Sequence, residues 1–115
     1  MRKTLVMALA VAAITAPAAA WAQAAAVKPT VISINVVNGR AIGGIKRPSV
    51  KKGITVRIVV TTNAGKEIHL HGYNIEKMPR KGVPTVIQFV AKLPGRFELE
   101  LHSPDALLAQ LTVRP

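Results

Sequence analysis

The strongest constraint on the fold is a two-residue alternation of apolar and polar side chains. It runs through residues 30–37, 54–62, 67–73, 84–91, 96–102 and 106–115. Successive side chains of a β-strand point to opposite faces, so each segment is predicted to be a strand. Turn residues separate the segments, as at Asn38-Gly39 and Pro94-Gly95. The stretch 40–50 has room for a seventh strand.

About seven short strands with little helix indicate an all-β fold, most simply an antiparallel β-sandwich. One face of each strand then supplies the core. The predicted core residues are Ile54, Val56, Ile58, Val60, Phe89, Phe97, Leu99 and Leu101.

The first 22 residues resemble a secretory signal peptide rather than part of the domain. Arg2 and Lys3 precede an apolar run, and Ala20-Trp21-Ala22 matches an A-x-A cleavage site. The run is too short for a membrane anchor, and Pro17 interrupts it. We expect cleavage after Ala22, or alternatively after Ala26, and a periplasmic or secreted protein with no transmembrane segment. Residues 23–29 are expected to be a flexible N-terminal segment and residues 30–115 the single domain.

Composition limits the partners. The chain has 16 Lys and Arg against 5 Asp and Glu, a formal net charge of +11, and no cysteine. Disulfides therefore cannot stabilise the domain. Without a recognition helix or more than a few aromatic side chains, nucleic-acid binding is not expected. The charge favours an acidic protein partner or an anionic lipid surface, or serves solubility alone.

The three histidines are the candidate site. In EIHLHGY, residues 67–73, alternation puts His69 and His71 on one face, about 6.6 Å apart along the strand. His102 ends a second strand, on the face opposite Phe97 and Leu99. Imidazole is a ligand for copper, zinc and nickel. His69, His71 and His102 are therefore candidate metal ligands, although a His-x-His pair on a strand is also common without any metal.

Several stretches in order resemble a cupredoxin, in particular the cupredoxin-like domains of exported bacterial proteins. They are VKKGITVRIVVTTN, EIHLHGYNI, VIQFVAKLPGRFELELH and LLAQLTVRP, which together span most of residues 30–115. The resemblance implies a Greek-key β-sandwich with a metal site at one end. It also implies one ligand at His69 or His71 and a second at His102.

The sequence departs from that family in its ligands. The cysteine and the methionine that a cupredoxin carries around its second histidine are missing, and Met78 lies in a different segment. Blue copper needs a thiolate, so no such centre can form. Two alternatives remain: a thiolate-free histidine site, with copper as the expected cofactor, or a metal-free interaction or structural module that has lost its copper site. We expect His71 and His102 to form the closer pair.

Catalysis is not expected. No Ser/His/Asp or Cys/His set can be assembled from neighbouring segments. Glu98 and Glu100 share one strand face, which is interpreted as a solvated surface rather than an acid/base pair.

Overall fold

A computed structural model of the protein describes residues 4–15, 27–103 and 105–115. The predicted cleavage positions after Ala22 and Ala26 lie outside these residues. Within them, nothing forms a helix of the length and apolarity that a bilayer crossing needs. The apolar side chains of residues 5–14 are 85–92% exposed and contribute nothing to the core.

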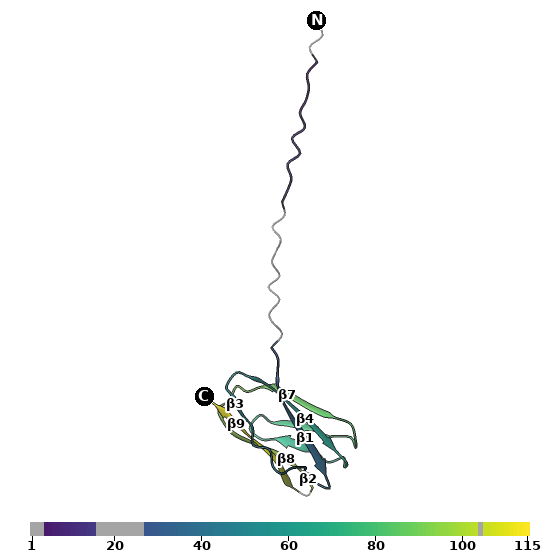
Figure 1. Cartoon of the computed structure of the whole chain (residues 1–115), viewed down its shortest axis with the longest axis vertical. Coiled ribbons are helices and arrows are strands. Elements are labelled where there is room, and N and C mark those ends of the chain that lie inside the picture. The colour runs from purple at the N-terminus through teal and green to yellow at the C-terminus, as the bar shows by residue number, and fades with distance from the viewer. Residues whose placement is uncertain (1–3, 16–26, 104) are drawn as a thin grey trace.

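Residues from Thr30 onward form two packed β-sheets (Figure 1). The four-stranded sheet has the order β2-β1-β4-β7, and the five-stranded sheet has the order β3-β9-β8-β5-β6. The strand bounds are β1 Thr30–Val37, β2 Arg40–Ala41, β3 Ser49–Lys51, β4 Thr55–Thr62, β5 Ile68–Leu70, β6 Ile75–Lys77, β7 Thr85–Val90, β8 Gly95–Leu101 and β9 Ala106–Arg114.

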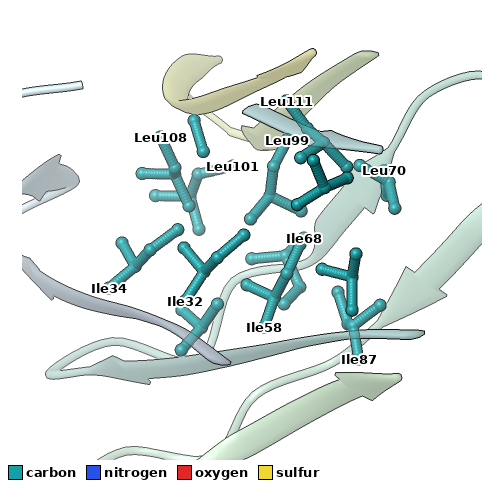
Figure 2. Close-up of a cluster of buried hydrophobic side chains, with 14 of the residues drawn as sticks. Ile32, Ile34, Ile58, Ile68, Leu70, Ile87, Leu99, Leu101, Leu108 and Leu111 are labelled. Carbon is teal, nitrogen blue, oxygen red and sulfur yellow. The ribbon is translucent and has the colours of Figure 1, made fainter. Parts of the chain in front are cut away.

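The core lies between the sheets, where aliphatic side chains from both inner faces meet (Figure 2). Its largest fully buried members are Ile34, Ile58, Ile68, Leu70, Ile87, Leu99, Leu101, Leu108 and Leu111. Every core residue lies between Ile32 and Val113, so residues 27–115 contain the whole core.

The prediction of an all-β sandwich is confirmed, with differences in detail. The described part of the chain has nine strands, because 40–50 supplies two short ones and Ile75–Lys77 adds another that was not predicted. The sheets are mixed, since β1 pairs with β4 and β3 with β9 in parallel. Alternation cannot distinguish the two directions, because a strand alternates identically in either.

Five of the eight predicted core residues are fully buried, and Phe89 and Phe97 are partly buried against the core. Ile54 was predicted wrongly, since its side chain is 37% exposed. The reason is its position: β4 begins at Thr55, so Ile54 lies at the end of the sandwich, beyond the cover of the second sheet.

Candidate metal centre

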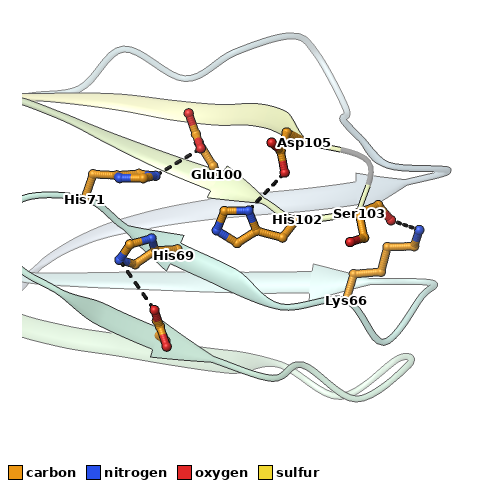
Figure 3. Close-up of polar contacts among 8 residues, drawn as sticks. Lys66, His69, His71, Glu100, His102, Ser103 and Asp105 are labelled. Carbon is orange, nitrogen blue, oxygen red and sulfur yellow. Dashed lines mark hydrogen bonds and ion pairs between the residues drawn. The ribbon is translucent and has the colours of Figure 1, made fainter.

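Two neighbouring strands of the five-stranded sheet position the three histidines. Ile68 and Leu70 of β5 are fully buried, so alternation turns His69 to the outer face. His71 follows the end of β5, and His102 follows buried Leu101 at the end of β8. Because β5 and β8 are paired, His102 meets His69 and His71 on one face, although more than thirty positions separate them in sequence (Figure 3).

The imidazole rings are close together. Ring centroids are 4.2 Å apart for His69 and His71, and 5.7 Å apart for His69 and His102. One nitrogen from each ring lies within 4.8 Å of those of the other two. Two nitrogens bound to one metal at about 2.1 Å each are at most about 4.2 Å apart. The nitrogens must therefore move closer together, by rotation of the rings, before all three can bind one ion.

The expected closeness of His71 and His102 is wrong, because their centroids are the farthest apart of the three pairs, at 6.4 Å. The direction of pairing explains this. β5 and β8 are antiparallel, and the backbone N–H of His102 donates to the carbonyl of Glu67. The N–H of His71 donates instead to the carbonyl of Glu98. His69 therefore lies between the other two.

Each histidine has a carboxylate beside it. Nε2 of His71 lies 3.0 Å from Glu100, and Nδ1 of His102 lies 3.0 Å from Asp105. An ionised carboxylate only accepts hydrogen bonds, so both ring nitrogens donate. In the neutral rings, the lone pair is then on Nδ1 of His71 and on Nε2 of His102. Such carboxylate–histidine pairs fix the ring orientation and raise ligand basicity in metal sites.

The hydrogen bond with Asp105 raises the pKa of His102 above its usual value, and nearby Glu67 and Glu100 act in the same direction. The same hydrogen bond lowers the pKa of Asp105. Both effects stabilise the charged pair when no metal is bound.

His69 is the least satisfied of the three. Its side chain is only 17% exposed, and Nε2 is 3.8 Å from Glu76, too far for a hydrogen bond. Among the described residues, this nitrogen is the one buried side-chain polar atom that has no hydrogen-bond partner. Leaving such an atom unpaired is costly, and a metal ion bound by the ring would offset that cost.

All five acidic residues of the chain lie around this group. Glu76, Glu100 and Asp105 flank the three rings. The backbone carbonyls of Glu67 and Glu98 accept hydrogen bonds from His102 and His71. The sequence interpretation of Glu100 as a solvated residue missed its bond to His71. A signal was present, because every acid lies within five positions of a histidine in an otherwise basic sequence.

An aromatic cluster borders the site at His71. The ring of Tyr73 is 4.6 Å from that of Phe89 and 4.7 Å from that of Phe97. The Tyr73 hydroxyl donates to the Leu93 carbonyl and accepts from the Leu93 N–H. Gly72 lies directly against the Phe97 ring, so the turn that follows His71 is packed against the cluster.

No protein-family model matches the sequence. A search of curated proteins likewise gives no match.

Solved structures do share the fold. A copper binding protein, determined in its apo form by NMR, matches with a TM-score of 0.59 and 16% identity, over 73% of this chain and 86% of that chain. A multicopper oxidase matches with a TM-score of 0.57 and 17% identity, over 74% of this chain and 42% of that chain. This chain therefore spans less than half of that oxidase.

A third match is the metal binding domain of the Cu(I) exporting P-type ATPase CopA from Streptococcus pneumoniae D39. It gives a TM-score of 0.50 and 19% identity, over 76% of this chain and 99% of that domain. Identities this low establish the fold and not the function. The chain has a cupredoxin-like β-sandwich fold, with three clustered histidines and no cysteine.

Proposed function

We propose that this protein is an exported copper-binding protein, whose site is formed by His69, His71 and His102. The observation that carries the proposal is the buried, unpartnered Nε2 of His69 within a group of three imidazoles. The copper proteins that share the fold support it, as does the concentration of all five acids around the rings.

The donor set favours Cu(II) over Cu(I). Imidazole nitrogen suits Cu(II), whereas thiolate and thioether sulfur select Cu(I). The chain has no cysteine. A surrounding of carboxylates also favours the ion of higher charge. By the usual order of affinities, Cu(II) is bound more tightly than Zn(II).

The role of the site is binding rather than catalysis. The side-chain hydrogen bonds of His71 and His102 go to carboxylates, and His69 lies beside a third. Among the described residues, none of the three rings is hydrogen-bonded to a hydroxyl that it would activate as a nucleophile.

Export to the periplasm or the exterior, with the leader removed, is part of the proposal. It is supported by the Arg2-Lys3 start, the apolar run and the Ala20-Trp21-Ala22 motif. The high exposure of the large apolar side chains of residues 5–14 supports it as well, because the domain does not use them.

The test is calorimetric titration of residues 27–115 with Cu(II) in a non-coordinating buffer, together with electron paramagnetic resonance to count nitrogen ligands. We expect His69→Ala to weaken binding most, because His69 lies between the other two rings. His71→Ala and His102→Ala should each weaken it by at least tenfold. Unchanged affinity in the His102 variant would overturn the three-histidine site and leave only a surface His-x-His pair.

A matched pair of variants tests the carboxylates. Glu100→Gln should weaken Cu(II) binding about 10–100-fold, because Glu100 orients His71. Glu98→Gln removes the same charge from the same strand face without touching that bond. Equal losses in the two variants would mean that the acids act only through their charge.

A further inference from the structure

One end of the sandwich gathers four cations from three separate segments. We call it the basic end and define it by Lys51, Lys52, Lys92 and Arg114. Lys51 is paired with Arg114 in the parallel register, and the N–H of Lys52 donates to the Arg114 carbonyl. Lys92 belongs to the same end, because the residue before it, Ala91, accepts a hydrogen bond at its carbonyl from the N–H of Gly53.

These charges are not neutralised by neighbours. All four side chains are exposed, and the ion pairs found in the described part of the chain involve histidines alone as the cations. The five acids of the chain surround the histidine site instead. The separation of acids from the basic end gives that end an uncompensated positive field.

Apolar side chains are exposed among these cations. Ile54 is 37% exposed, Val90 is 40% exposed and Leu93 is 49% exposed. The N–H of Ala91 donates to the carbonyl of Ile54, so Ile54 and the segment of Val90 and Leu93 lie side by side. Exposed aliphatic residues next to lysines are the combination that binds lipid interfaces, where the cations meet phosphate headgroups and the aliphatic groups enter the boundary with the acyl chains.

We propose that the basic end docks on an anionic lipid bilayer. An acidic protein would match the charge, but it would not account for the isolated aliphatic side chains that project between the lysines. The path of the chain before β1 also agrees with docking at this end. Thr30 of β1 is paired with Val56 in parallel, so the segment before β1 leaves the sandwich at this end (Figure 1). That segment adds Lys28 and Val27, which is 72% exposed.

Docking at the basic end leaves the histidine site accessible. His69 is paired with Glu100 of β8, while Gly95, at the other end of the same strand, is paired with Val113 next to Arg114. At about 3.3 Å per residue, His69 lies about 16 Å along the strand from the basic end, and His71, whose N–H donates to the Glu98 carbonyl, lies about 10 Å from it. This inference is independent of metal binding, because it uses none of the histidines.

The test is co-sedimentation of residues 27–115 with vesicles of phosphatidylcholine alone and of phosphatidylcholine mixed equally with phosphatidylglycerol. We expect binding only to the anionic vesicles, and weaker binding as salt is raised. A basic residue near an anionic surface contributes about 1 kcal/mol, or about fivefold in partitioning. The triple variant Lys51→Gln, Lys52→Gln, Lys92→Gln should therefore partition about 100-fold less.

The matched control removes three exposed lysines elsewhere, Lys46→Gln, Lys77→Gln and Lys81→Gln, with the same change in net charge. It should lose less than tenfold. Equal losses in the two triple variants would overturn the assignment, because net charge alone would then account for binding. Leu93→Gln should weaken binding several-fold at unchanged charge. Failure of the unmodified domain to bind anionic vesicles at low salt would overturn the proposal and leave an acidic protein as the occupant to test.

Discussion

Replacing Gly72 with alanine should destabilise the protein through two separable effects. Gly72 has φ +83°, a conformation that costs an L-residue about 1–2 kcal/mol. A Cβ at this position would also lie 2.6 Å from Cε1 of Phe97, and closer still to Cδ1. Carbon atoms pack at about 3.5–4.0 Å, so the ring must move, at a cost of about 1–3 kcal/mol. The expected loss in unfolding free energy is about 2–5 kcal/mol.

A double-mutant cycle separates the two effects. In a Phe97→Ala background the overlap is gone, so Gly72→Ala should cost only the about 1–2 kcal/mol of backbone strain. Gly53→Ala is the matched control, because Gly53 has φ +92° and no atom within 4 Å of the added Cβ. It should cost about 1–2 kcal/mol whether or not Phe97 is present.

Urea unfolding of residues 27–115, followed by far-UV circular dichroism, measures all of these quantities. Residues 27–115 contain no tryptophan, so intrinsic fluorescence is a poor substitute. Equal costs for Gly72→Ala with and without the Phe97 ring would refute the packing argument. A coupling free energy of about 1–3 kcal/mol would support it.

Three further predictions concern stability and the site. Ile58→Ala should cost about 2–5 kcal/mol, whereas Ile54→Ala should cost less than about 1 kcal/mol, because Ile58 is buried and Ile54 is exposed; urea unfolding measures both. The raised pKa of His102 stabilises the fold below the usual pKa of 6.5, and this contribution is lost as pH rises through the raised pKa. The lowered pKa of Asp105 stabilises the fold above the usual 3.8, and this contribution is lost as pH falls through the lowered pKa. The difference in Tm between the unmodified protein and Asp105→Asn should therefore be largest between pH 3.8 and pH 6.5, the usual pKa values of the two groups. It should shrink above the raised pKa of His102. A pH-independent difference would contradict the pairing. Cu(II) at 100 times its Kd should add about 2.7 kcal/mol to the unfolding free energy, seen as a rise in Tm that EDTA reverses; no rise would contradict binding to the native state.

Much of the fold follows from alternation, and the misses have physical causes. Burial of Ile68 and Leu70, and the outward turn of His69, follow from the two-residue period alone. The strand at Ile75–Lys77 is too short to show a period. Ile54 continues the alternation, but the pattern does not say where the opposite sheet stops covering a strand.

The composition of the site was predictable, but its arrangement was not. The pattern of residues around the three histidines is enough to turn them away from the core. Predicting the order of the three rings also requires the direction in which the strands pair. That direction places His102 beside Glu67 rather than beside His71. The bond between His71 and Glu100 also depends on register, because the two residues lie diagonally across the strands and not directly opposite.

The position of β9 has a consequence for how the chain acquires its structure. This C-terminal strand lies between β3 and β8, and it supplies Leu108, Leu111 and Val113 to the core. The five-stranded sheet therefore cannot assemble until residues 106–114 are available, and the parallel β3–β9 pairing closes a loop of about sixty residues. During synthesis this sheet and its share of the core therefore cannot be completed before residues 106–114 have been made. For the export proposed above, this late closure would delay completion of the sheet until β9 has followed the rest of the domain through the export channel.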